Sequence, residues 1–416
     1  MSVLKFIRKL LKIKRFRIVD FSFKNWGKEL WLEVKPYKNG RRCPHCGKPG
    51  KIIRTAQKAR IWRDVPVCGI QVFLVYHPRE IRCKQHGRGQ ENIPWASIYA
   101  RVTHRFEYLL LIYCSIMTQK AAAKLLRIST STLSDLLHRT ITRFRQGHKI
   151  RALTHIGIDE ISYCKGRKYA TIVYDLKHSN VVWIGQGKGR KTIDRFFERE
   201  LSQYQRQQVI AASCDMAQIY INAIEHWCPN AALVLDRFHV VKALNTAVDG
   251  VRKEQWRQAT SKDEKIALKG LRWLLYKHSS KRSKEDVKRL KALYMNGNRR
   301  IHRAWVLSDE FEQFWDFDNQ IEAKDFLDNW CKTANRSRLE PIKNFVKLIK
   351  KHEDRLLPFV DTRLTNAIAE GLNRIIKIAK NRASGFRTLD AFSDIIFLMV
   401  GDLDIPAQIP TCFRTI

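Results

Sequence analysis

The stretch that decides the fold is residues 154–175, THIGIDEISYCKGRKYATIVYD. One apolar run, residues 155–158, leads to Asp159, and a second run, residues 169–174, follows a short turn. A third run, residues 181–184, comes after another turn. Short apolar runs bounded by turn residues predict neighbouring strands. The centre of the chain is therefore expected to hold a sheet, within a multidomain α/β protein.

Two further apolar runs downstream also lead to carboxylates. Residues 209–213 precede Asp215, residues 232–235 precede Asp236, and residues 219–227 predict a helix between them. Each acid alone is more often a helix cap or a solvated surface charge. As a set, acids at strand ends converge on one edge of a sheet. Their oxygens are suitable ligands there for divalent cations that hold phosphate.

Glu370 is the candidate third carboxylate of this site. It lies in residues 365–389, TNAIAEGLNRIIKIAKNRASGFRTL, where Asn366, Asn373 and Lys377 share its helix face at three- and four-residue spacing. A polar face with one acid, two amides and a cation fits a helix beside a metal–phosphate site. The apolar face expected to be buried consists of Ile368, Leu372, Ile375, Ile376 and Ala379.

Two short motifs near the start of the chain predict a zinc module. Cys43 and Cys46 form CPHCG, and Cys83 and His86 form CKQHG. Each pair has the two-residue spacing that lets its side chains converge on one tetrahedral ion. The module has little core of its own, so the Zn²⁺ is expected to be structural. The residues near enough in sequence to replace one of these ligands are His45, Cys68 and His77.

Residues 118–144 predict a helix-turn-helix after an apolar helix over residues 106–117. Ile128 and Ser129 mark the turn, and Thr130 or Ser131 is expected to cap the second helix. The residues expected to be buried are Ala121, Ala122, Leu125 and Leu126 in the first helix and Leu133, Leu136 and Leu137 in the second. The residues that the second helix would offer to a DNA groove are Ser131, Thr132, Ser134 and Arg139.

The charge of the chain favours a nucleic-acid partner. Its 416 residues include 78 Lys and Arg against 40 Asp and Glu, a formal net charge of +38. Residues 1–150 hold 32 of the basic and 8 of the acidic residues. Such a surface attracts polyphosphates. The opening MSVLKFIRKLLKIKRF could instead mimic a membrane-surface helix. No apolar run reaches the roughly 18–20 residues of a bilayer span, so we expect a cytoplasmic, nucleoid-associated protein without a membrane partner.

Residues 246–360 are expected to be helical and charged. The five tryptophans of this stretch are expected to pack between helices rather than to stack on bases. They are Trp256, Trp273, Trp305, Trp315 and Trp330. The best candidates for phosphate contacts are residues 281–291 and 298–303, although a solvated charged face is an equal alternative.

Four runs of the sequence resemble the ISL3 family of bacterial insertion-sequence transposases. The runs are GIDEISYCKGRKYATIVYD, SCDMAQIYINAI, VLDRFHVVKALN and NAIAEGLNRIIKIAKNRASGFR. The two cysteine motifs and the helix-turn-helix also match the family's layout, so the resemblance covers nearly the whole chain. One departure is His86, because many relatives would have cysteine as the fourth zinc ligand.

The resemblance implies an RNase H-like catalytic core that an all-helical insertion interrupts. Its DDE triad would be Asp159, Asp215 and Glu370, which would bind Mg²⁺ or Mn²⁺. Asp236 and His239 match the DxxH element that supports the active site of related transposases. The implied domains are residues 1–100 (zinc-binding), 101–150 (helix-turn-helix), 151–245 (core, first part), 246–360 (helical insertion) and 361–416 (core, second part).

The implied partners are the element's terminal inverted repeats and a target DNA, bound by a homodimer or a larger assembly. Asn373, Lys377 and Arg382 surround the third acid and are assigned as DNA contacts. The chain has no P-loop glycine motif, so ATP is not expected. Two alternatives stay open. One is a DNA-binding regulator that has lost catalysis, and the other is an RNase H-like nuclease that cuts without joining.

Overall fold

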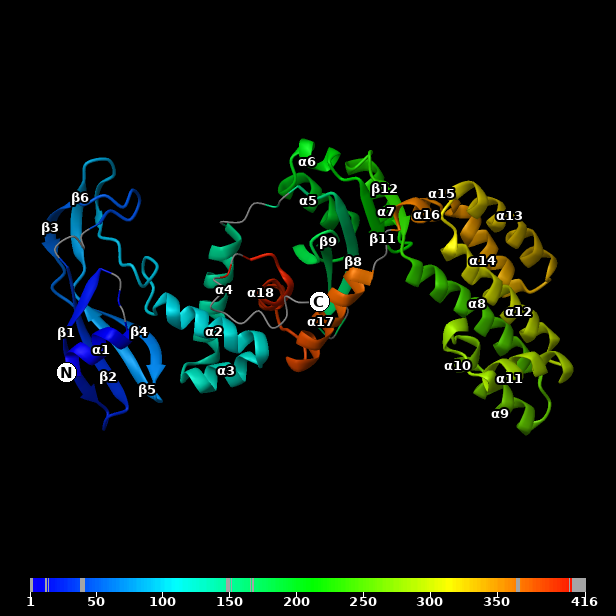
Figure 1. Ribbon diagram of the computed structural model, residues 1–416, viewed down its shortest axis with the longest axis horizontal. Helices are drawn as coiled ribbons and strands as arrows, with labels where there is room; N and C mark the ends of the chain where they lie inside the picture. The colour runs from blue at the N-terminus through cyan, green and yellow to red at the C-terminus, as the bar shows by residue number, and fades with distance from the viewer. Residues whose placement is uncertain are drawn as a thin grey trace. The chain divides into compact units, whose positions relative to one another are not determined.

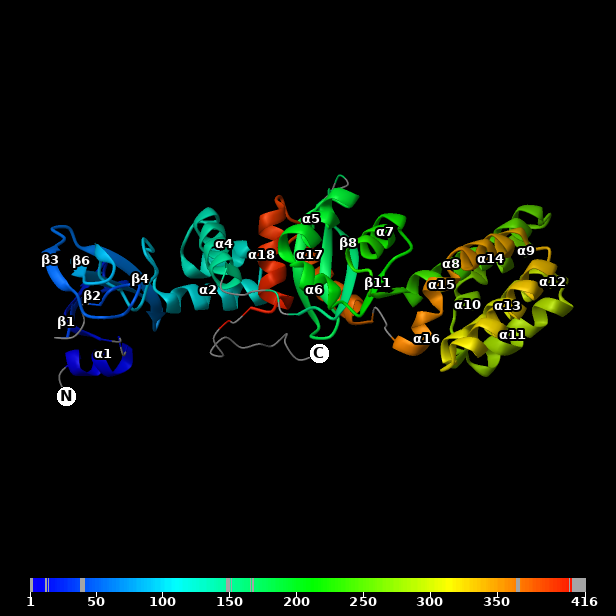
Figure 2. The same cartoon turned by 90° about the horizontal axis from the view of Figure 1, so that it is seen from above.

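The computed structural model divides into two compact units, residues 1–148 with 403–416 and residues 149–402, and each is described by itself. The elements are labelled in Figures 1 and 2. The residues that the structure describes are 3–11, 13, 15–37, 42–146, 150, 152–164, 166, 168–363, 367–403 and 405. Asn366, predicted to share the face of Glu370, lies outside them. None of the helices in these ranges combines the length and apolar character needed to cross a membrane.

The first unit begins with a helix and a four-stranded sheet of order β1-β2-β5-β4. Alternate residues point inward, so Leu32, Val72 and Leu74 are fully buried and pack around Trp62. Strands β4 and β5 pair as an antiparallel hairpin, with Arg60 opposite Tyr76. The elements are α1 (Val3–Leu11), β1 (Phe16–Lys24), β2 (Glu29–Pro36), β4 (Arg60–Val67) and β5 (Ile70–Tyr76).

A three-stranded antiparallel sheet carries the two cysteine motifs. Its strands are β3 (Lys51–Thr55), β6 (Arg79–Cys83) and β7 (Gly87–Gln90), in the order β3-β6-β7. Cys83 is the last residue of β6, and His86 directly precedes β7. The β6–β7 turn therefore holds one ligand pair at a fixed place on the sheet.

Three helices follow, α2 (His104–Ile116), α3 (Gln119–Leu126) and α4 (Thr130–Gln146). The predicted helix-turn-helix corresponds to α3 and α4. The buried face predicted for its first helix was partly wrong. Ala122, Ala123 and Leu126 are buried, whereas Ala121 and Leu125 face solvent. Helices α2 and α4 both pack against α3, and these buried residues form the face of α3 that they cover. The buried residues predicted for α4 are confirmed.

The second unit is built on a five-stranded sheet of order β10-β9-β8-β11-β12. Strands β8, β9 and β10 are antiparallel, whereas β11 and β12 run parallel to β8. The prediction that Asp159 ends its strand is wrong, because β9 continues the ladder beyond it. The strands are β8 (His155–Cys164), β9 (Lys168–Asp175), β10 (Asn180–Gln186), β11 (Ala211–Cys214) and β12 (Ala232–Leu235).

Helices cover both faces of this sheet. Ile158 and Val173 face a core shared with α5 and α7, while their neighbours Asp159 and Tyr174 face α17. Helix α18 packs beside α17 and stacks Phe392 on Tyr163. The covering helices are α5 (Arg190–Glu200), α7 (Gln218–Trp227), α17 (Ala367–Arg382) and α18 (Leu389–Val400), and the short α6 (Gln203–Gln207) follows α5.

Residues 237–363 form helices and turns without a strand. Helix α8 leaves the sheet directly after β12 and runs into this helical segment. Trp305, Trp315 and Trp330 are buried as predicted. The segment comprises α8 (Arg237–Gln258), α9 (Lys262–Gly270), α10 (Arg272–Leu275), η1 (Ser279–Lys281), α11 (Lys284–Met295), α12 (Arg299–Phe311), η2 (Glu312–Asp316), α13 (Gln320–Arg336), α14 (Glu340–Lys351), α15 (Glu353–Leu356) and α16 (Pro358–Thr362).

The packing prediction fails for the other two tryptophans of this segment. Trp256 is 40% exposed and Trp273 is 73% exposed. Both lie where consecutive helices meet solvent at the α8–α11 end of the segment.

Candidate functional site

The sheet brings the first two acids to neighbouring strands. Strand β11 pairs with β8 only as far as Ile158, so Asp159 stands one residue beyond the end of that pairing. Asp215 stands one residue beyond the end of β11 itself. The parallel register therefore places both acids at the same edge, as the strand-end argument predicted.

Asp236 and His239 lie at the next strand along. Asp236 follows β12 and caps α8, accepting a hydrogen bond from the Phe238 N–H at 3.0 Å. His239 lies one turn into the helix, with its Nε2 3.7 Å from a carboxylate oxygen of Asp236. Asp236 therefore caps α8 and also lies at the strand next to β11, and its role in the site stays a prediction.

Asn373 of α17 anchors Asp159. Its amide nitrogen donates to Asp159 Oδ2 at 2.6 Å, and its amide oxygen accepts from the Tyr174 hydroxyl at 2.6 Å. Burial holds the pKa of Tyr174 well above its usual value, so the phenol keeps the proton it donates. Asn373 is only 7% exposed. Asn373 was expected to contact DNA. Its burial and its hydrogen bond to Asp159 instead favour a role in orienting that carboxylate.

Glu160 is a further acid at the site that the sequence argument did not single out. It points to the opposite face of β8 from Asp159, where the Tyr220 hydroxyl donates to its Oε1 at 2.8 Å. Burial raises the pKa of Glu160, and the charges of Asp215 and Asp159 raise it further. Its position directly after Asp159 was the only signal in the sequence.

The acids lie close enough to affect one another's ionisation. Burial raises the pKa of Asp159, and the charge of Asp215 adds to this effect. Burial also raises the pKa of Glu370, together with the charge of Asp236, while His239 opposes the shift. Several carboxylates that repel one another in a partly buried site favour binding of a divalent cation.

Helix α17 also carries Glu370, Lys377 and Arg382, which differ in how far they are exposed to solvent. Glu370 lies exposed in the first turn, and Lys377 is exposed two turns later, where its charge lowers the pKa of Glu370. Arg382 ends the helix half-buried, with a guanidinium nitrogen 3.9 Å from Met399 Sδ. Of the expected apolar face, Ile368 is 37% exposed and the other four residues are buried.

Asp159→Asn is expected to stabilise the metal-free protein at neutral pH. The folded pKa of Asp159 is raised above that of the unfolded chain, so its ionisation lowers stability as the pH rises through the folded pKa. The amide avoids this cost and still accepts the hydrogen bond of Asn373. The apparent Tm of the variant should exceed that of the wild type by a few degrees at pH 8, and the difference should vanish near pH ~4.

A second measurement tests whether Asp159 contributes to Mg²⁺ binding. Thermal denaturation with and without the ion should show stabilisation of the wild type and a smaller effect on Asp159→Asn. A variant less stable than the wild type at every pH would refute the repulsion argument.

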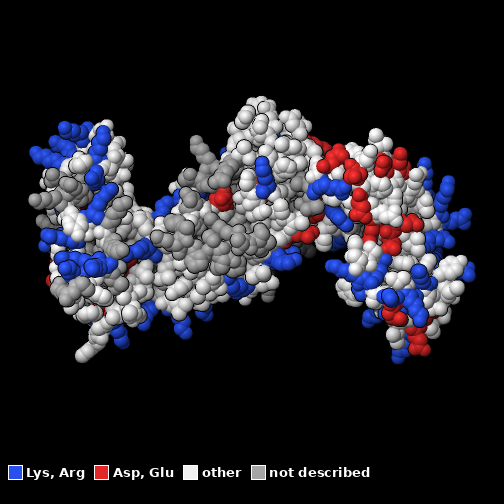
Figure 3. All heavy atoms as spheres, viewed as in Figure 1, with Lys and Arg blue, Asp and Glu red and all other residues white. Residues whose placement is uncertain are grey.

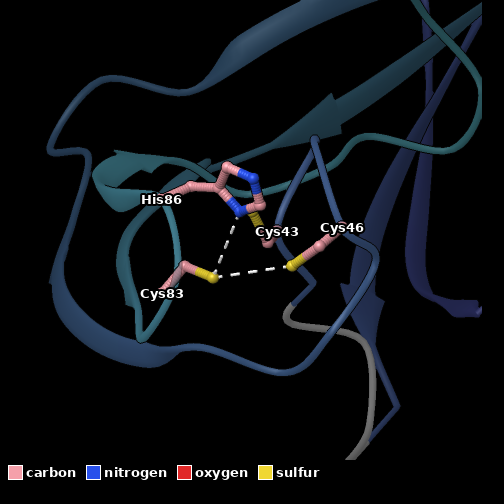
Figure 4. A group of neighbouring side chains, drawn as sticks. All are labelled: Cys43, Cys46, Cys83 and His86. Atoms are coloured by element: carbon pink, nitrogen blue, oxygen red, sulfur yellow. Dashed lines mark hydrogen bonds between the residues drawn. The ribbon is translucent and has the colours of Figure 1, made fainter.

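The zinc-motif residues converge as predicted (Figure 4). Cys43, Cys46, Cys83 and His86 place their ligand atoms within 4.8 Å of one another. The Cys46 and Cys83 sulfurs are 3.6 Å apart, and His86 Nδ1 lies 3.8 Å from the sulfurs of both Cys43 and Cys83. A tetrahedral ion with Zn–S bonds of ~2.3 Å separates sulfurs by roughly 3.8 Å, so the donor set fits Zn²⁺.

The three possible substitute ligands lie outside this group. Cys68 is exposed in the β4–β5 turn. His77 bonds the Ala56 carbonyl at 2.9 Å, and the His45 ring lies 5.2 Å from that of His86. Hydrogen bonding from His86 lowers the pKa of Cys83 to about 6, which favours the thiolate that zinc binds.

Among the residues that the structure describes, no other group of three or more such ligands is this close. The carboxylates of Asp159, Asp215 and Glu370 are therefore more widely spaced. Two catalytic metal ions typically lie about 3.5–4 Å apart. The ligands of a two-metal site are therefore spaced more widely than the ligands of one tetrahedral ion.

Helix α4 presents most of its predicted DNA-contact residues to solvent. Ser131, Thr132 and Arg139 are exposed, and Ser134 is half-buried. The cap is Ser129 rather than Thr130 or Ser131, because its hydroxyl accepts from the Thr132 N–H at 3.0 Å. The hydroxyls of Ser131 and Thr132, at the exposed start of α4, also lie 2.9 and 2.8 Å from the Ser129 hydroxyl.

These features define a class of protein: a zinc-ribbon and helix-turn-helix DNA binder joined to a carboxylate-bearing α/β domain. Three family models match this chain. One described as transposase, for the DDE domain of the ISL3 family, covers residues 156–396. The helix-turn-helix domain of transposase family ISL3 covers residues 91–141, and the zinc finger of transposase IS204/IS1001/IS1096/IS1165 covers residues 40–86. The chain belongs to the ISL3 family of transposases.

Similar proteins carry the same description along most of their length. The transposase for insertion sequence element IS1001 of Bordetella parapertussis is 29% identical over 373 residues, which is 88% of this chain and 90% of that protein. The transposase for insertion sequence element IS1557 of Mycobacterium tuberculosis is 26% identical over 381 residues, 86% and 85% of the two chains. The chain is thus a DNA-binding transposase, an enzyme of DNA cleavage and transfer.

Proposed function

We propose that this transposase cuts DNA at the ends of an insertion sequence and joins them to a target with Mg²⁺ or Mn²⁺. The site would consist of Asp159, Asp215 and Glu370. The observation that carries the proposal is electrostatic: the charge of Asp215 raises the pKa of Asp159, and the charge of Asp236 raises the pKa of Glu370, although these acids are far apart in sequence. The sheet order and mixed strand directions support an RNase H-like core, with the helical segment as its insertion.

The bound metal ions would activate the attacking oxygen and offset negative charge developing on phosphate. The protein's own residues prepare that site. Asn373 fixes the Asp159 carboxylate, and Tyr220 fixes Glu160 on the other side of the strand. Asp236 and His239 adjust the charge around Glu370 from the start of α8. Lys377 and Arg382 would contact DNA phosphates beside the acids.

The first unit would select the DNA. The zinc module would stabilise the β3-β6-β7 sheet, and Ser131, Thr132, Ser134 and Arg139 would enter a groove of the terminal inverted repeat. We propose the domain limits 1–100, 101–150, 151–245, 246–360 and 361–416. We also propose a homodimer or larger assembly on DNA, because two element ends must be processed together. Neither ATP nor a membrane takes part in this scheme, and the protein would act at the bacterial nucleoid.

A cleavage and joining assay on labelled element ends tests the proposal. Wild type should nick and join DNA only with Mg²⁺ or Mn²⁺, and Asp215→Asn should bind the same DNA without either reaction. Nicking without joined products would identify a nuclease. Binding without metal-dependent cleavage in the wild type would identify a regulator.

Asn373→Ala is expected to weaken catalysis by changing the position of Asp159. Removing a residue that orients a metal ligand typically costs about 10–100-fold in metal affinity or activity. The cleavage rate should fall most at low Mg²⁺ and recover partly as Mg²⁺ is raised. Titrating cleavage against Mg²⁺ measures this, with Asn381→Ala, an exposed site on the same helix, as the control. An equal loss at every Mg²⁺ concentration would contradict a positioning role.

A further inference from the structure

One end of the helical segment exposes large aromatic rings. Trp273 is 73% exposed, Tyr294 is 48% exposed and Trp256 is 40% exposed. All three lie in or beside α8–α11, consecutive helices that pack at the same end of the segment (Figure 1). The other three tryptophans of the segment, Trp305, Trp315 and Trp330, are buried in its hydrophobic core. The exposed rings are therefore available to bind a partner.

Each exposed ring has a cation packed over its face. The charged groups lie 5.1 to 5.8 Å from the ring centres, a distance typical of cation–π contacts. Arg272 contacts two rings at once, those of Trp273 and Tyr276, which restricts how Trp273 can turn. The other pairs are Lys265 with Trp256 and Arg299 with Tyr294.

The aromatic end is also the basic end of the segment. Residues 262–303 contain 14 Lys and Arg against four Asp and Glu. Residues 309–328 contain one Lys and eight Asp and Glu. On the face in Figure 3, acidic side chains gather toward α15, α16 and the adjoining part of α13, Lys and Arg lie together with some acidic groups over α10 and α11, and further Lys and Arg line the outer edge beside α13. A polyanion is therefore attracted more strongly to residues 262–303 than to residues 309–328.

We propose that this basic aromatic end, residues 256–299, binds an unpaired DNA strand, with a base stacked on Trp273. The exposed lysines Lys281, Lys284 and Lys288 would contact its phosphates. A duplex hides the faces of its bases, whereas an unpaired base can stack on an exposed ring. The inference rests on the proposed function, because strand cleavage creates ends whose terminal bases can separate.

Binding of labelled DNA by the full chain, without Mg²⁺, tests the proposal. The two probes are a blunt duplex and the same duplex with a short single-stranded extension. Stacking contributes ~1–3 kcal/mol per base, so Trp273→Ala should weaken binding of the extended probe by about 5- to 150-fold. The blunt probe should change less than about 2-fold, and Trp273→Tyr should retain most of the affinity.

The salt dependence of binding tests the phosphate contacts. Replacing Lys281, Lys284 and Lys288 by Gln should reduce the slope of log affinity against log salt by about 2 for the extended probe, since each single-strand contact contributes ~0.7. The matched control replaces three exposed lysines at the acidic end, Lys324, Lys332 and Lys347, by Gln and should leave the slope unchanged.

Three results would overturn the proposal. They are no loss with Trp273→Ala, an equal loss on both probes, or a change in oligomeric mass with DNA affinity intact. The last would show that a second copy of the chain covers the surface. Failure of the proposed function is distinguishable, because it would appear as a wild-type protein that does not cut DNA, whatever the effect of Trp273→Ala on binding. Trp273 is exposed, so the variant should keep the wild-type Tm.

Discussion

Glu370→Gln is expected to lower metal-dependent DNA cleavage on the order of 10³-fold, with DNA affinity unchanged. The amide has the size of the carboxylate but neither its charge nor its ability to hold a cation by both oxygens. A metal ion supplies several kcal/mol of charge stabilisation, and about 1.4 kcal/mol corresponds to a factor of ten in rate. Burial and the neighbouring Asp236 raise the pKa of Glu370, and removing its charge should also ease that repulsion.

Single-turnover cleavage of an element end measures the effect. Glu322→Gln, which changes an exposed acid in the first turn of α13, is the matched control and should cleave at the wild-type rate. Cleavage by Glu370→Gln within tenfold of the wild type would remove Glu370 from the proposed triad. The assignment would then have to move to another acid of the site, with Asp236 and Glu160 the first to test.

Cys83→Ser is expected to unfold the zinc module. Zinc binding contributes an apparent ~10–16 kcal/mol to the folding of small zinc modules, far more than the β3-β6-β7 sheet can supply from its own core. Ile81 is the most deeply buried side chain of those strands, at 1% exposure. The variant should lose its zinc, become sensitive to protease within residues 40–90, and lose affinity for the element end.

Metal content by mass spectrometry and limited proteolysis test this directly. Cys68→Ser is the matched control, because Cys68 is an exposed cysteine of the same unit outside the ligand group. It should retain one zinc per chain. His86→Cys, which would give the site four cysteines, should hold zinc more tightly against a chelator. Full zinc retention by Cys83→Ser would exclude the four-residue site.

Local patterns in the sequence were sufficient to predict the parts of the fold with short-range causes. The CPHCG and CKQHG spacings predicted the ligand group, and the apolar runs predicted the strands of the five-stranded sheet, β8 to β12. Strand β1 was missed because its irregular register between Ile18 and Asp20 breaks the alternation of buried and exposed residues, whereas β2 was missed although its residues alternate regularly. The place of Asp159 was also misjudged, since only pairing with β9 extends β8 past it.

The catalytic neighbourhood could be predicted only in part. The strand-end rule predicted Asp159, Asp215 and Asp236 as one set of acids, and helical spacing predicted Glu370 and Asn373; the catalytic role of these residues stays a prediction. Nothing in the spacing showed that Asn373 points inward to Asp159 and Tyr174, because that depends on how α17 packs across the sheet. Exposure of Trp273 was likewise hidden, because a tryptophan at a helix end has the same sequence signature whether it packs or projects.

The order of the elements along the chain has a consequence for timing during protein synthesis. Helix α4 ends at residue 146, and the acid at residue 370 lies 224 residues later, after the whole helical segment. At ~5–20 residues per second, the DNA-binding helices precede that acid out of the ribosome by roughly 10–45 s. On the proposed assignment of Glu370, a nascent chain would engage DNA near its own gene before it could cut. A product that ends prematurely within the helical segment would occupy element ends and block them against complete copies.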